Sequence, residues 1–257
     1  LRSEPPRPSR KRGGERQFGR KTLILKKHLR REHRTLPMPR LYIISGCNGS
    51  GKTTSSYTLL PELLDCRQFV NSDEFAKALS PFDPSKVKVK ASRYMLMKIQ
   101  YLLERKETFA IETTLATRSL LKTIAKAREA GYHITVLYFW LNSPDMAVNR
   151  VAARVAAGGH DIPEETIRRR YEVGIRYFIE DYAPACDRWI LADNSVPPFK
   201  VVAEGTNIPR EDLQFNEDGS ISSSMTVTSS INVKDRRCYR TILDQVVESR
   251  SSYRDLQ

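Results

Sequence analysis

The chain alternates short apolar runs with amphipathic segments between about residue 38 and residue 205. Each apolar run is rich in β-branched or aromatic side chains and is short enough for a buried strand. The segments between the runs repeat apolar residues three and four positions apart, which indicates helices with one face against a core. This alternation predicts an α/β fold in which a mainly parallel sheet is the middle of three layers. The expected strands are 41–44, 68–71, 108–111, 134–141 and 187–194.

The two ends of the chain lack this alternation. We expect residues 1–37 to form a disordered basic tail, because their few apolar side chains bury too little surface to offset the entropy of ordering. The first methionine is Met38, directly before the first expected strand, so the alternative is that the tail is not part of the native protein. We expect the core domain to span 38–205 and residues 206–257 to form a polar extension with one helix around 239–247.

The charge of the chain is concentrated near its start. The net charge of +13 comes from 43 Lys and Arg against 30 Asp and Glu, and residues 1–40 alone hold 14 basic and 3 acidic residues, a net of +11. The remaining residues therefore carry only +2, which is no electrostatic footprint for DNA or RNA. A nucleic-acid partner is expected only through the tail.

The cysteines and the hydropathy indicate the compartment. The four cysteines are widely spaced and form no C-x-x-C pair, which is typical of a reducing compartment. No apolar run reaches 18 residues, so we expect no membrane span. Together these features predict a cytoplasmic protein.

One stretch carries a specific chemical signal. The sequence from Gly46 to Thr53 fits the phosphate-loop pattern G-x-x-x-x-G-K-[ST], between an expected strand and an expected helix. Backbone N–H groups of such a loop converge on phosphate oxygens, while Lys52 would reach the β- and γ-phosphates and the Thr53 hydroxyl would hold Mg²⁺. A glycine-rich turn without a ligand is the alternative, but a turn alone does not require the Gly-Lys-Thr ending. The predicted ATP-binding residues are Gly46, Asn48, Gly49, Ser50, Gly51, Lys52, Thr53 and Thr54.

Polar residues follow two further strands. Asp73 comes just after the strand at 68–71, and the run Glu112-Thr113-Thr114 ends the strand at 108–111. The carboxyl ends of parallel strands are where open α/β sheets bind ligands. A carboxylate at Asp73 could accept the proton of an attacking hydroxyl, although a role in capping the next helix is an equal alternative.

Two arginine-rich helices are predicted on either side of a Gly-Gly loop. Arg154 lies near the end of the first, the loop covers 156–163, and 168–170 is a run of three arginines in the second. Such a composition is typical of a lid that closes on phosphate, because the forked donors of arginine suit the charge spread over a transferring phosphoryl group. A solvated charged face is the ordinary alternative, so only one or two of these arginines are expected to touch phosphate.

Taken together, residues 39–205 resemble the zeta-toxin-type family of phosphate-loop kinases. The resemblance rests on the loop, Val70-Asn71-Ser72-Asp73, Ile111-Glu112-Thr113-Thr114 and the arginine lid. It implies a P-loop kinase domain with a helical arginine-rich lid, using ATP and Mg²⁺. It further implies UDP-N-acetylglucosamine as a candidate acceptor and an antitoxin protein as a candidate partner. By residue, it implies that Lys52 and Thr53 hold ATP and Mg²⁺, Asp73 is the general base, Glu112 and Thr114 hold the acceptor, and Arg154 and Arg170 stabilise charge.

The sequence thus favours an ATP-dependent kinase that phosphorylates a hydroxyl of a small molecule. A polynucleotide kinase or nucleic-acid-associated ATPase that uses the basic tail is the main alternative. A GTP switch is disfavoured because no Asn-Lys-x-Asp sequence occurs in the chain. An ATP-dependent interaction protein without phosphoryl transfer is a further alternative.

Overall fold

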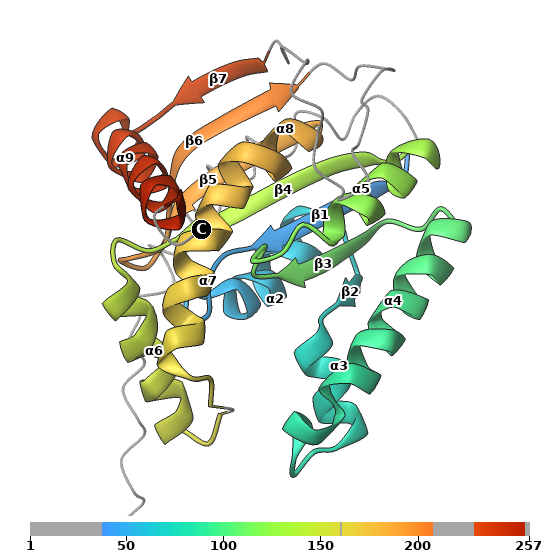
Figure 1. Cartoon of the computed structure of the whole chain (residues 1–257). Coiled ribbons are helices and arrows are strands. Elements are labelled where there is room, and N and C mark those ends of the chain that lie inside the picture. The colour runs from blue at the N-terminus through green and yellow to red at the C-terminus, as the bar shows by residue number, and fades with distance from the viewer. Residues whose placement is uncertain (1–37, 160, 208–228, 255–257) are drawn as a thin grey trace, which may run out of the picture. The chain divides into compact units, whose positions relative to one another are not determined.

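The computed structural model describes residues 38–159, 161–207 and 229–254. The predicted basic tail, residues 1–37, and most of the polar stretch that follows β6 lie outside the described residues. The elements of the described part are shown in Figure 1.

A seven-stranded sheet forms the middle layer, with the strand order β2-β3-β1-β4-β5-β6-β7. The first five strands in this order pair in parallel, and the last two are antiparallel to their neighbours. The α/β fold with a mainly parallel sheet is therefore confirmed. The strands are β1 Arg40–Ser45, β2 Gln68–Val70, β3 Phe109–Thr113, β4 His133–Trp140, β5 Arg188–Asp193, β6 Lys200–Asn207 and β7 Ser229–Val233.

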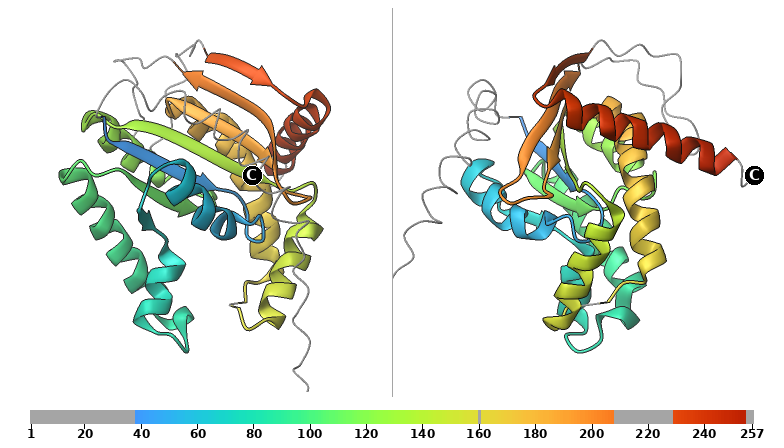
Figure 2. Two further views of the ribbon diagram at one scale, coloured as in Figure 1. Left: turned by 180° about the vertical axis from the view of Figure 1, so that it is seen from behind. Right: turned by 90° about the vertical axis from the view of Figure 1, so that its left-hand side faces the viewer.

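Helices cover both faces of this sheet. Helices α5 and α7 lie on one face and α2 on the other, as the views from the front, the back and the side agree (Figures 1 and 2). The helical elements are α2 Lys52–Leu63, α3 Ser72–Leu79, η1 Pro84–Val87, α4 Lys88–Glu104, α5 Leu120–Glu129, α6 Pro144–Ala156, α7 Glu164–Tyr177, the π-helical turn η2 Phe178–Tyr182, α8 Ala183–Ala185 and α9 Arg236–Arg254.

The apolar pattern explains the centre of the sheet. All residues of β4 except His133 are buried, because the strand is flanked by β1 and β5 and covered on both faces. Its apolar sequence removes the cost of leaving polar side chains there. The next helix, α6, has a start typical of its sequence: Ser143 accepts a hydrogen bond from the backbone N–H of Met146, and Pro144 occupies the first turn.

The region expected to form a polar extension after residue 205 contributes two described elements, β7 and α9. Strand β6 runs on to Asn207, and β7 pairs with it from Ala203 to Asn207. Helix α9 then buries Ile242 and Val246 in the same core as the central strands. The helix expected around 239–247 lies within α9, whereas β7 was not expected because its sequence is largely polar. Strand β6 is not at the edge of the sheet, because β7 pairs with it.

Candidate active site

The phosphate loop occupies the turn between β1 and α2, at the carboxyl ends of the parallel strands. Gly46 has φ 139°, and a Cβ atom there would lie 2.3 Å from the backbone oxygen of Phe139. Gly51 has φ 84°, and its Cβ would lie 2.5 Å from Nδ2 of Asn194. Only glycine combines this backbone conformation with so close an approach. The loop is therefore seated against the ends of β4 and β5.

The residues that follow β5 hold the phosphate loop in place. The side-chain amide of Asn194 donates to the backbone oxygen of Ser50 at 2.7 Å. Arg150 of α6 in turn donates to the backbone oxygens of Asn194 at 3.0 Å and Ser195 at 2.8 Å. We call Arg150, Asn194 and Ser195 the loop clamp. Sequence reasoning missed it, since Arg150 lies 44 residues before Asn194 and Ser50 lies 144 residues before it, and no local pattern connects them.

Lys52 already has a fixed position within the loop. Its Nζ donates to the backbone oxygen of Cys47 at 2.9 Å, and the residue is only 7% exposed. Burial lowers the pKa of Lys52, and the nearby carboxylate of Glu112 opposes this shift. An ammonium group with three donors retains two for a phosphate.

Thr53 and Glu112 form the centre of a polar network. The hydroxyl of Thr53 lies 2.8 and 2.9 Å from the two carboxylate oxygens of Glu112, and Nδ2 of Asn71 donates to the same carboxylate at 3.0 Å. Burial raises the pKa of Glu112, and Lys52 opposes that rise. The structure thus places Glu112 beside the predicted metal-binding hydroxyl. The sequence analysis expected it to hold the acceptor.

Asp73 lies in the first turn of α3 and is exposed. The cap of this helix is Asn71, whose side-chain oxygen accepts from the backbone N–H of Asp73 at 2.8 Å. The capping role weighed for Asp73 is therefore filled by another residue. Because Asn71 also bonds Glu112, it connects the backbone of Asp73 to the carboxylate of Glu112.

The arginines of the predicted lid differ in their contacts. Nη1 of Arg170 donates to Oδ1 of Asn48 in the phosphate loop at 3.0 Å. Arg168 instead pairs with Asp145 at 2.6 Å and with Glu164 at 2.8 Å, so it joins α6 to the start of α7. Of the three tandem arginines, Arg170 is the one that bonds the loop.

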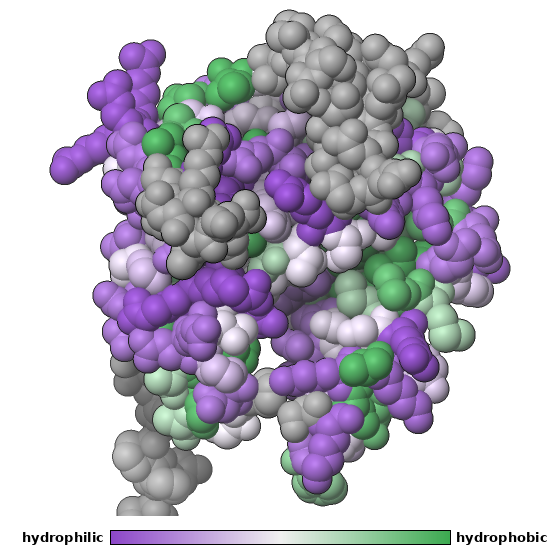
Figure 3. All heavy atoms as spheres, in the orientation of Figure 1, coloured by the Kyte–Doolittle hydropathy of each residue, from purple (hydrophilic) through white to green (hydrophobic). Residues whose placement is uncertain are grey.

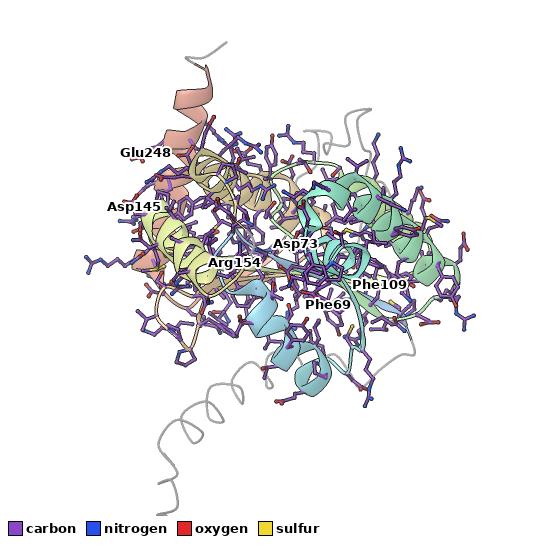
Figure 4. All side chains as sticks on the ribbon, turned by 90° about the horizontal axis from the view of Figure 1, so that it is seen from below. Phe69, Asp73, Phe109, Asp145, Arg154 and Glu248 are labelled. Carbon is purple, nitrogen blue, oxygen red and sulfur yellow. The ribbon has the colours of Figure 1, made fainter. Side chains whose placement is uncertain are left out.

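Charges from both sides of the site act on each other. Burial lowers the pKa of both Lys52 and Arg170, and the charge of Asp73 opposes both shifts. The charge of Arg154 lowers the pKa of Lys52 further. Asp73 comes from α3 and Arg154, which is exposed, from α6 (Figure 4). Figure 3 shows a hollow between the part of the molecule formed by α3 and α4 and the part formed by α6 and α7. A ligand on the phosphate loop could extend into this hollow.

The remaining predicted residues lie at the borders of the site. Gly49 packs against α6, with the backbone oxygen of Ala147 2.7 Å from its hypothetical Cβ. Ser50 is fully buried, whereas Thr54 is exposed on α2. The backbone oxygen of Thr114 lies against Gly174 of α7, so the loop after β3 touches the helix that carries Arg170.

Comparisons with known proteins identify a family and a relative for this chain. The family described as an AAA domain matches residues 41–172. A protein of Haemophilus influenzae whose function is uncharacterized is 31% identical over 127 residues, which cover 49% of this chain and 88% of that protein.

Two solved structures share the fold. The structure of the PezAT chromosomal toxin-antitoxin system of Streptococcus pneumoniae matches with a TM-score of 0.52 and 15% identity, over 74% of this chain and 81% of that one. The AvrRxo1-ORF1:ORF2 structure with ATP matches with a TM-score of 0.57 and 15% identity, over 89% of this chain and 70% of that one. These likenesses confirm the fold that the resemblance to zeta-toxin-type P-loop kinases implied. Among the described residues, no helix is both long and apolar enough to cross a membrane.

Proposed function

The chain belongs to the AAA-domain family, and from this premise we propose that it is an ATP-dependent kinase that transfers the γ-phosphate to a hydroxyl group of a small molecule. One observation carries the proposal: hydrogen bonds connect Thr53 of the phosphate loop through Glu112 and Asn71 to the backbone of Asp73. These hydrogen bonds fix the backbone that carries the carboxylate of Asp73 relative to the phosphate loop. A protein that only binds ATP does not need the second group.

The residues around the loop have the donors that phosphate binding needs. The loop's backbone and Lys52 would bind the β- and γ-phosphates. Arg170, which bonds Asn48 of the phosphate loop, and Arg154, on the opposite side of the hollow from Asp73, would stabilise negative charge on the transferring phosphoryl group. The loop clamp would keep the backbone donors in place.

The oxygen atoms beside the loop fit Mg²⁺. The hydroxyl of Thr53 uses its hydrogen toward Glu112, which leaves its lone pairs available to a cation. Hydroxyl and carboxylate oxygens are the ligands that Mg²⁺ prefers. Thr53 would hold the ion directly and Glu112 would orient Thr53 and any water on the ion. When bound, Mg²⁺ would neutralise charge on the β- and γ-phosphate oxygens.

The transfer then uses Asp73 as the base. The acceptor oxygen forms a bond to the γ-phosphorus while the bond from that phosphorus to the β–γ bridging oxygen breaks, and ADP leaves. The proton of the acceptor hydroxyl passes to the carboxylate of Asp73. Because Asp73 is exposed at the hollow, a substrate can reach it. UDP-N-acetylglucosamine, implied by the family resemblance, is the first acceptor to test.

The test follows ATP turnover by the full-length chain with and without UDP-N-acetylglucosamine, with products identified by mass. Asp73→Asn should abolish the phosphorylated product while ATP affinity stays near that of the wild type. The matched control is Glu74→Gln, which removes a charge one residue away that pairs with Lys77. Equal turnover by Asp73→Asn and Glu74→Gln would refute the role of Asp73, and an ATP-binding protein that phosphorylates no acceptor would refute the kinase proposal.

An antitoxin-like partner is part of the same proposal, because the Streptococcus pneumoniae structure is of a toxin-antitoxin system. If the activity is toxic, expression of the wild-type chain should arrest bacterial growth and expression of Lys52→Ala should not. Equal growth of both strains at equal protein levels would remove the reason to expect such a partner.

A further inference from the structure

Helix α9 lies outside the part of the chain that matches the AAA-domain family. It crosses α7 and packs against it, as the views in Figures 1 and 2 agree. Ile242 is fully buried and Val246 is 3% exposed, and both belong to the main core. The helix is therefore anchored to the domain along one face, and α7 is one of the elements that it contacts.

A polar junction lies at the centre of this contact. Oε1 of Gln245 accepts a hydrogen bond from Nε1 of Trp140, the last residue of β4, at 3.2 Å. The same oxygen lies 3.4 Å from the hydroxyl of Tyr171 on α7. That hydroxyl donates to the backbone oxygen of Leu141 at 2.7 Å. Gln245 thus bonds the end of the central strand and contacts the hydroxyl of Tyr171 on α7 at the same point.

The junction has little freedom to rearrange. Tyr171 is 5% exposed and Trp140 is 4% exposed, so neither polar group can turn to water without leaving the core. A buried polar group that loses its partner carries the full cost of its desolvation. Further along the same contact, Nη1 of Arg176 donates to the backbone oxygen of Ser249 at 3.4 Å, and Arg250 pairs with Glu180.

The residue next to Tyr171 is Arg170, which bonds Asn48 in the phosphate loop. Successive residues of a helix share a rigid backbone, so a shift of Tyr171 would move the Cα atom from which the Arg170 side chain extends. Small displacements of charge-stabilising groups are costly, because their effect depends on a fixed position relative to the reacting atoms.

We propose that α9 positions α7 through Gln245 and thereby keeps Arg170 at the phosphate loop. Gln245 is a positioning residue, because it acts through Tyr171 and touches neither the loop nor the hollow. The kinetic consequence rests on the proposed kinase activity, whereas the effect on α7 does not.

The experiment compares three full-length variants. Gln245→Leu keeps the approximate size of the side chain and removes the acceptor, whereas Gln245→Glu keeps an acceptor oxygen. Val247→Ala is the control, because Val247 is on the same helix but 59% exposed. Gln245→Leu should lower kcat about tenfold with a smaller change in KM for ATP. Gln245→Glu and Val247→Ala should stay near the wild type.

A double-mutant cycle separates positioning from general damage. If Gln245 acts through Arg170, then Gln245→Leu should lower kcat no further once Arg170→Ala is present. If the two losses simply multiply, Gln245 acts on activity by another route and the proposal is wrong.

Hydrogen exchange provides a readout that needs no activity. Backbone amides of residues 164–177 should exchange faster in Gln245→Leu than in Val247→Ala. A wild-type chain that turns over no ATP would refute the proposed function, and the exchange measurement would still decide whether Gln245 holds α7. Equal exchange in the two variants, or faster exchange with unchanged kcat in an active enzyme, would overturn the inference.

Discussion

The loop clamp can be tested by placing a methyl group where the structure has none. Gly51→Ala would put a Cβ atom 2.5 Å from Nδ2 of Asn194 at a φ of 84°. Gly131 provides the matched control, since its φ is 82° and a Cβ there would meet nothing within 4 Å. The two substitutions therefore impose the same backbone strain and differ in the collision with Asn194.

The expected magnitudes follow from these two contributions. A left-handed conformation costs an L-residue roughly 1–2 kcal/mol relative to glycine, and Gly131→Ala should lose about that much unfolding free energy. Gly51→Ala must also displace the amide of Asn194 from the backbone oxygen of Ser50, a buried hydrogen bond of 2.7 Å. Losing that bond and leaving its groups unpaired costs about 1–3 kcal/mol more. Gly51→Ala should therefore cost about 2–5 kcal/mol in total.

The assay is urea denaturation of the full-length variants, with ATP affinity measured in parallel. ATP affinity should fall for Gly51→Ala and not for Gly131→Ala, because only the first disturbs the loop that binds phosphate. Asn194→Ala removes the atom that collides, so the double variant Gly51→Ala/Asn194→Ala should lose less than the sum of the two single losses. Equal destabilisation by Gly51→Ala and Gly131→Ala, or strict additivity in the double variant, would refute the clamp as we describe it.

Three other predictions concern stability and reactivity. Burial raises the pKa of Glu112 above its usual 4.5, so the folded chain binds this proton more tightly than the unfolded chain does, and the unfolding free energy falls as pH rises from about 4.5 through the folded pKa. In urea titrations over that pH range, the unfolding free energy of Glu112→Gln should therefore increase relative to that of the wild type. The same pH dependence in both proteins would contradict this. Ser143→Ala should lower the unfolding free energy by about 1 kcal/mol through loss of the α6 cap, and an unchanged urea midpoint would contradict that role. Burial raises the pKa of Cys47 from 9.0 to about 11, so its thiolate fraction near pH 8 should be roughly 100-fold below that of an exposed thiol, and rapid alkylation of native Cys47 would contradict this.

Local patterns were sufficient to predict much of the fold. The apolar run of β4, the phosphate loop and the Ser143-Pro144 start of α6 each depend on residues close together in sequence, and the structure has all three. At the edge of the apolar face of a helix, a periodic pattern cannot determine which of two apolar residues packs against the core. Leu96 of α4 is 60% exposed, whereas Ile99, which belongs to the same apolar pattern on that helix, is buried.

Long-range pairing was the part that the sequence could not supply. Glu112 was expected to hold the acceptor, and its hydrogen bonds with Thr53 and Asn71, which lie 59 and 41 residues away, could not be read from the sequence. The strand order decides which hydroxyl lies nearest to Glu112, and hence whether its carboxylate is placed to orient a metal ligand or to hold the acceptor. The same holds for Gln245 of α9, which lies 105 residues from Trp140. Helical periodicity can detect α9 but cannot say what it packs against.

The hydrogen bond from Lys52 to the backbone oxygen of Cys47 has a consequence for the entropy of nucleotide binding. A free lysine side chain has about 2 kcal/mol of rotamer entropy to lose when it is fixed. In this protein the loop itself buries the side chain and orients its ammonium group, so most of that loss belongs to folding. Phosphate would then bind to the two remaining N–H donors of Lys52 at little further cost in side-chain entropy. Less of their attraction to phosphate is offset, so the affinity is higher.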